Sequence, residues 1–194
     1  MSFGYKTSWL AVRDQTVEEV ADALDLRKRV ELGFAEGTER AYTSGVYVAA
    51  PISGWTLAHG RDLPLDAGQP DFAEELCALS ERLGEVQFFG THRVVDYHAW
   101  AWARSGELVR GYCYVGESGD VPLFQGEPTP AEVTLGKGTQ PLDDAFDGWS
   151  DDEIDTWFAT TPDEGDVMAI AGAWSLDPTQ IDDSSVTAAG IWGR

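Results

Sequence analysis

The stretch 92–115 constrains the fold more than any other part of this sequence. Two runs rich in valine, tyrosine and tryptophan, 92–104 and 107–115, flank the pair Ser105-Gly106. Aromatic and β-branched residues favour strands, and a small-residue pair ending in glycine between two such runs indicates a tight turn. The pattern predicts a β-hairpin. Because apolar and aromatic residues occupy both faces of its strands, we expect this hairpin to lie at the centre of a sheet.

The register of the hairpin brings together one set of candidate catalytic residues. With Ser105-Gly106 as the loop, the predicted cross-strand pairs are Arg104 with Glu107, Trp102 with Val109, Trp100 with Gly111 and His98 with Cys113. Asp96 lies two residues from His98, on the same face. A thiol beside an imidazole that a carboxylate orients is the arrangement that activates a thiolate nucleophile. Cys113, His98 and Asp96 are therefore the candidate catalytic residues, and the alternative is that Cys113 is a small buried apolar group.

Shorter signals predict the remaining elements. Strands are predicted at 7–13, 26–34, 45–50 and 85–89 and from residue 55 onward, and helices at 16–25 and 71–83, with short helices beginning at 129, 150 and 163. The first helix begins with a capping box of Thr16 and Glu19, and the second ends at Gly84. Strands joined by tight turns pair antiparallel, and helices between groups of strands are typical of the α+β class. We expect a single α+β domain over 1–194, with an antiparallel sheet, helices packed mainly on one face, and an acidic helical part from about residue 128.

The balance of charge excludes two classes of partner. The chain has 34 acidic residues against 13 lysines and arginines, a formal net charge of −21. Nucleic acids and anionic lipid surfaces are bound through lysine and arginine, so neither is an expected partner. No apolar run reaches the roughly 18 residues of a membrane span, and two cysteines, Cys77 and Cys113, make no disulfide framework. We expect the protein in the cytoplasm, where thiols stay reduced.

Motifs for a metal or a cofactor are missing from the sequence. His59, His92 and His98 do not have the spacing of zinc ligands. The acidic run around Gly148 places Ile154 where an EF-hand calcium loop needs a glutamate. Glycine-rich phosphate loops are also missing. We therefore expect neither a metal nor a cofactor.

The acidic C-terminal segment indicates a protein partner. From residue 140 to the end there are thirteen aspartates and glutamates, and the only basic residue is Arg194. Acidic side chains steer a basic partner, and aromatic side chains supply binding energy at interfaces. The candidate contact residues are Asp147, Trp149, Asp151, Asp152 and Asp155. The alternative is a solvated surface whose aromatic residues face the core.

Two stretches carry a resemblance to other sequences. SFGYKTSWLAVR at 2–13 and FGTHRVVDYHAW at 89–100 resemble segments of uncharacterised bacterial proteins, a resemblance that implies no functional residues. In composition and layout the chain also resembles the immunity proteins of bacterial toxin systems. This second resemblance implies a non-enzymatic inhibitor that covers the active site of a basic toxin or nuclease.

Two alternatives belong to other functional classes. A small enzyme or small-molecule-binding protein would use the aromatic face around Trp100, Trp102 and Tyr112, with Cys113 and His98 as reactive groups. A structural subunit would instead form a homodimer through an exposed face of the sheet.

Overall fold

The computed structural model describes residues 2–116, 118–139 and 148–194. Within these residues the strands are β1 (Thr7–Arg13), β2 (Val30–Leu32), β3 (Val46–Val48), β4 (Trp55–His59), β5 (Glu85–His92), β6 (Tyr97–Arg104), β7 (Glu107–Val115), β8 (Asp120–Gln125) and β9 (Gly190–Gly193). The helices are α1 (Val17–Ala23), α2 (Phe34–Thr43), α3 (Phe72–Leu83), α4 (Pro130–Leu135), α5 (Asp151–Thr160) and α6 (Glu164–Trp174), with a 3₁₀ turn, η1 (Pro178–Gln180).

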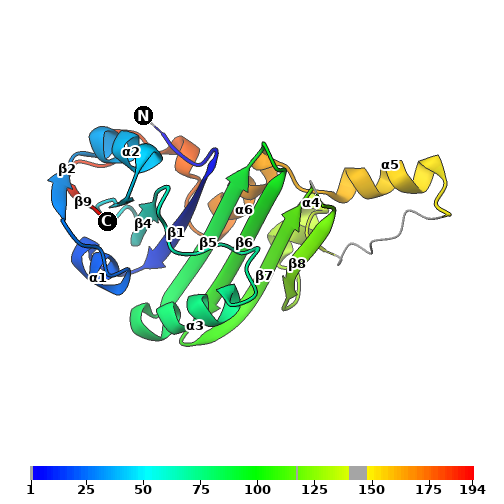
Figure 1. The fold of residues 1–194 in the computed structure, drawn as a ribbon, viewed down its shortest axis with the longest axis horizontal. Helices are drawn as coiled ribbons and strands as arrows, with labels where there is room; N and C mark the ends of the chain where they lie inside the picture. The colour runs from blue at the N-terminus through cyan, green and yellow to red at the C-terminus, as the bar shows by residue number, and fades with distance from the viewer. Residues whose placement is uncertain (1, 117, 140–147) are drawn as a thin grey trace.

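These strands form one sheet in the order β2-β9-β3-β4-β1-β5-β6-β7-β8, antiparallel at every pairing (Figure 1). The last strand of the chain, β9, inserts between β2 and β3. Antiparallel pairing with helices outside the strand order is the α+β class, which confirms that prediction. Among the described residues, no helix combines the length and the apolar character of a membrane span.

The central hairpin is confirmed, but its register is not. Ser105 and Gly106 both have positive φ, as a two-residue turn of type I′ requires, and Arg104 lies opposite Glu107. Beyond Ala103 the register shifts by one residue, which leaves Val109 as the extra residue of a β-bulge. The pairs observed beyond the bulge are Trp102 with Arg110, Trp100 with Tyr112, Ala99 with Cys113 and His98 with Tyr114. The predicted pairs of Trp102 with Val109, Trp100 with Gly111 and His98 with Cys113 are therefore wrong.

Both faces of the sheet are covered by helices, whereas the prediction placed them mainly on one. Phe88 and Phe89 follow each other on β5, so their side chains point to opposite faces. The Phe88 ring packs against Phe72 of α3, with ring centroids 4.9 Å apart. The Phe89 ring packs against Trp174 of α6 at 5.8 Å, so α3 and α6 lie on opposite faces. A central strand that is apolar on both sides needs this double cover.

Helix α2 is an element that the sequence pattern did not predict. Strand β2 occupies only three residues of the segment 26–34, and α2 begins at Phe34. The buried positions of α2 are Phe34, Gly37, Thr38 and Ala41, at helical spacing. Small and polar residues at three of these positions hide the apolar periodicity. Gly37 is small because the ring of Tyr47 packs directly against its backbone.

The three C-terminal helices begin where predicted. α4, α5 and α6 each start with a capping box, formed by Thr129 with Glu132, Ser150 with Glu153, and Asp163 with Asp166. Helix α5 projects away from the sheet, as Figure 1 shows at the end of the molecule next to β8. Its inner end is held by the ammonium group of Lys137, which donates to the carbonyl groups of Ala159 and Thr161.

Candidate functional site

The predicted thiol site is not assembled. The shifted register places Cys113 and His98 on opposite faces of the sheet, because they now occupy adjacent rather than facing positions. His98 Nε2 does lie 3.0 Å from Asp96 Oδ1. Cys113 is buried, and this burial raises the pKa of its thiol well above the ordinary value. A protonated thiol on the far face from the imidazole is not an activated nucleophile, so the predicted geometry is wrong.

The aromatic face proposed for a ligand is mostly inside the protein. Trp100 and Tyr112 stack on each other, with ring centroids 4.6 Å apart, and both are buried. Trp102, which is half-buried, borders a cavity of about 730 Å³ between β5, β6, α4 and α6. A ligand in that cavity would contact this one of the three predicted aromatic residues.

The acidic contact residues fall on or near α5. Asp147 lies outside the described residues. Asp151, Asp152 and Asp155 are exposed, whereas Trp149 is half-buried and packs against the core. Trp157, from the same helix, is buried against Tyr114 with ring centroids 6.2 Å apart. Phe158 departs from this pattern, since 56% of it is exposed beside the acids.

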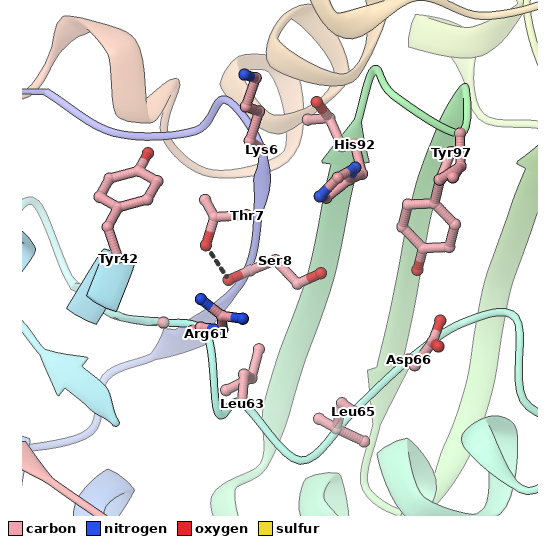
Figure 2. Close-up of a pocket in the computed structure, with 13 residues that line it drawn as sticks. Lys6, Thr7, Ser8, Tyr42, Arg61, Leu63, Leu65, Asp66, His92 and Tyr97 are labelled. Atoms are coloured by element: carbon pink, nitrogen blue, oxygen red, sulfur yellow. Dashed lines mark hydrogen bonds between the residues drawn. The ribbon is translucent and has the colours of Figure 1, made fainter. Parts of the chain in front are cut away.

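A cavity of about 780 Å³ opens at one end of the sheet (Figure 2). Antiparallel pairing places the start of β1 beside the ends of both β4 and β5. Four segments therefore meet there: residues 6–8, Tyr42 at the end of α2, the loop 60–66, and the β5–β6 turn with Tyr97. The volume lies in the range of small-molecule sites.

The cavity is lined by two cations, Lys6 and Arg61, for which the described residues provide no partner. Among the described residues, ten of the thirteen lysines and arginines make an ion pair, a side-chain hydrogen bond or a contact with an aromatic ring: Arg13, Arg27, Arg29, Arg40, Arg82, Arg93, Arg104, Arg110, Lys137 and Arg194. The three that remain are Lys6, Lys28 and Arg61. Lys6 and Arg61 both line the cavity, together with the exposed His92. In Figure 2 the Arg61 guanidinium and the His92 ring point into the cavity, and Lys6 lies at its rim.

The floor of the cavity adds a hydroxyl group that is free to bind a ligand. Ser8 Oγ has no hydrogen-bond partner among the described residues, whereas the hydroxyl groups of Thr7, Tyr42 and Thr91 all donate to protein oxygens. Gly90, next to Ser8 on the neighbouring strand, has no side chain because the ring of Tyr97 packs there: a Cβ would lie 2.7 Å from that ring and 3.0 Å from Ser8 Oγ.

Tyr97 closes the other side of the floor and anchors the loop above it. Its hydroxyl accepts a hydrogen bond from the backbone N–H of Ala67, at 3.1 Å. Burial, reinforced by nearby Cys113 and Asp66, raises the pKa of Tyr97 well above its ordinary value. The hydroxyl therefore stays protonated at neutral pH, and the loop is fixed to the sheet at this point.

These cavity residues were not among the predicted site residues. Lys6, Arg61 and His92 come from separate segments, and no local pattern marks any of them. The signal that identifies them is the lack of an acidic partner in a strongly acidic chain. That signal depends on contacts, so it cannot be read from the sequence.

The donor groups that line this cavity are of the kind that bind an anion. Among the described residues, no group of three or more histidine, cysteine or acidic side chains could hold a metal ion. Guanidinium, ammonium and hydroxyl groups are instead the donors that bind carboxylate and phosphate. Comparison of the chain with protein-family models, with curated proteins and with solved structures finds no match.

Proposed function

We propose that this protein binds a small organic anion in the cavity at the ends of β1, β4 and β5. The observation that carries the proposal is that Lys6 and Arg61, which have no partner among the described residues, line one cavity of a chain with a net charge of −21. Most cations in such a chain acquire an acidic neighbour, and in the described part of this chain seven of the thirteen lysines and arginines form ion pairs. The presence of two cations without such a neighbour on one cavity indicates that they bind an anion from outside the protein.

The lining of the cavity defines the kind of anion. The planar guanidinium of Arg61 suits a carboxylate or a phosphate group, which accepts two parallel hydrogen bonds. Leu63, Leu65 and Val95 supply apolar wall on the same cavity. A ligand with an anionic group and a short apolar body would use both kinds of surface.

Calorimetry and NMR titration with butyrate and with inorganic phosphate test this proposal. Lys6→Gln and Arg61→Gln are the test variants, and Lys28→Gln is the matched control. Lys6 and Lys28 are both exposed, unpartnered and at positive φ, 55° and 48°, but Lys28 lies outside the cavity. Loss of one charge-assisted contact should weaken binding by roughly tenfold, while Lys28→Gln binds as wild type does. Binding that is absent, or unchanged in Arg61→Gln, would reject the proposal.

A second candidate function is the inhibition of a basic protein through α5. The exposure of Asp151, Asp152 and Asp155 next to the half-exposed Phe158 favours it, because interfaces combine steering charges with apolar anchors. The inhibitor would act in the cytoplasm and cover the active site of a basic toxin or nuclease. The free thiols of the chain suit that compartment.

Charge reversal at matched positions tests this second candidate. Asp152 and Glu18 both occupy the second position of a helix that begins with a capping box, and both are exposed. Asp152→Lys should abolish the salt-dependent retention of a single basic partner from the native cell, whereas Glu18→Lys should leave it unchanged. Equal retention by both variants would exclude α5 as the contact surface.

A further inference from the structure

We infer that the ligand of the cavity is bipolar, with an ammonium group at the end opposite to its anionic group. This inference rests on the proposed function and extends it to a substrate class. The observation that carries it is a second charge in the same cavity, the carboxylate of Asp66. Figure 2 shows Asp66 on the Tyr97 side of the cavity, with Leu63 and Leu65 between it and Arg61.

Asp66 carries a negative charge that no cation among the described residues neutralises. Its two oxygens accept hydrogen bonds from the backbone N–H of Gly68 at 3.0 Å and from the amide of Gln69 at 3.4 Å, and both donors are uncharged. No lysine or arginine among the described residues forms an ion pair with it. Its side chain is exposed, so a ligand can reach it.

Arg61 and Asp66 carry opposite charges in the same cavity but do not form an ion pair with each other, so each can bind a separate group of a ligand. Arg61 and Asp66 are five residues apart in one loop, and flexible exposed side chains at such a separation can form an ion pair. The conformation of the loop prevents this ion pair. Leu65 and Ala67 are buried on either side of Asp66, and the Ala67 N–H is bonded to the Tyr97 hydroxyl. Asp66 is thereby held at one side of the cavity and Arg61 at the other.

The arrangement matches one ligand chemistry. A carboxylate or phosphate group would meet the guanidinium of Arg61 and the free hydroxyl of Ser8. A protonated amine would meet Asp66, and the methylene groups between them would lie against Leu63 and Leu65. The ligand class is therefore a small zwitterion whose charged groups lie at opposite ends of an apolar chain.

A series of ω-amino acids tests the inference directly. The probes are 4-aminobutyrate, 5-aminopentanoate and 6-aminohexanoate, each compared by calorimetry with the carboxylate and the amine of the same chain length. In the wild-type protein, the best amino acid should bind roughly tenfold tighter than its matched carboxylate, which corresponds to about 1.4 kcal/mol for the added contact between charged groups. Asp66→Asn should remove that advantage and leave carboxylate binding intact. Its amide oxygen can still accept from Gly68, so the loop should keep its conformation.

The controls separate this inference from the function on which it rests. Asp71→Asn removes the same charge at an exposed position outside the cavity and should bind every probe as wild type does. If amino acids and carboxylates bind equally well, and both are weakened in Arg61→Gln, the bipolar ligand is excluded while the anion site stands. If Arg61→Gln changes the binding of none of the probes, or none of them binds, both proposals are rejected.

Discussion

Replacement of Glu132 by glutamine should be among the most destabilising single changes in this protein. Glu132 and Arg110 form an ion pair in which both side chains are 0% exposed. Oε1 of Glu132 accepts hydrogen bonds from Trp100 Nε1 and Arg110 Nε, both at 2.8 Å. Oε2 accepts from the backbone N–H and the hydroxyl of Thr129, at 2.7 and 2.8 Å. All the carboxylate oxygens of this buried residue are therefore in use.

The magnitude follows from what glutamine cannot do at this position. One carboxylate oxygen becomes an NH₂ group, and whichever oxygen is replaced, at least one N–H donor (of Trp100 and Arg110, or of the Thr129 backbone) then faces another donor. The guanidinium of Arg110 also remains buried without a counter-charge. Removal of one partner from a buried pair costs about 3–5 kcal/mol. For a chain of this length, we expect the melting temperature to fall by about 6–20 °C.

Two further capping boxes of the same chain provide the comparison. Thr16 with Glu19 and Ser150 with Glu153 form capping boxes like that of Thr129 with Glu132, but these residues are exposed and have no arginine bonded to the glutamate. Urea unfolding followed by tryptophan fluorescence should show a much larger loss for Glu132→Gln than for Glu19→Gln or Glu153→Gln. Equal losses in all three variants would refute the claim that the buried pair, rather than the cap, stabilises this region.

Removal of both charges should recover only part of that loss. In many proteins a buried ion pair can be replaced by apolar residues at little cost. Here the guanidinium of Arg110 also donates to the carbonyl groups of residues 111, 125, 126 and 138. Arg110→Met combined with Glu132→Leu leaves these buried acceptors without a donor. Full recovery in the double variant would show that these carbonyl contacts contribute nothing.

Three other changes test separate parts of the fold. Burial lowers the pKa of His59 from 6.5 to about 3, so between these pH values the unfolded chain binds a proton that the folded chain excludes. The free energy of unfolding should therefore fall as pH decreases from 6.5 towards 3. Urea unfolding at several pH values should show that His59→Phe reduces this slope by about 1.4 kcal/mol per pH unit. Cys113 should resist iodoacetamide in the native protein and react only in urea, and mass spectrometry showing native labelling would revive a reactive thiol. Gly37→Ala should destabilise the protein despite the higher helix propensity of alanine, because the new Cβ would lie 2.2 Å from the ring of Tyr47. Gly172→Ala on α6, where a Cβ has room, should instead stabilise the protein by up to about 1 kcal/mol in the same unfolding assay.

Local signals predicted the elements of this fold better than their pairings. A turn or a capping box involves residues within four positions of each other, so the Ser105-Gly106 turn and the C-terminal helix starts lie where expected. The register of β6 against β7 depends instead on a bulge at Val109 that turns Arg110 towards Glu132, 22 residues further along the chain. No pattern inside the hairpin encodes that partner. One extra residue was enough to move Cys113 to the other face from His98.

The candidate site was hidden for a related reason. The sequence displays all thirteen cations, but whether each has a partner is decided by tertiary contacts. Lys6 and Arg61 line the same cavity only because β1 pairs with β4 on one side and with β5 on the other. The acidic C-terminal segment, in contrast, is identified by its composition, which is visible in the sequence. The cavity is instead marked by two cations, Lys6 and Arg61, that form no ion pair among the described residues of a strongly acidic chain.

That background makes a further prediction about how the cavity selects its ligand. The net charge of −21 repels an anion such as pentanoate, and this long-range repulsion is screened by salt. The same charge exerts little net force on zwitterionic 5-aminopentanoate. Competition by salt anions at Lys6 and Arg61 affects both probes alike. The advantage of the zwitterion should therefore shrink as salt rises from about 10 to 150 mM, where the Debye length falls from about 30 to 8 Å. An advantage that is independent of salt would mean that the net charge of the protein does not contribute to the discrimination between the two probes.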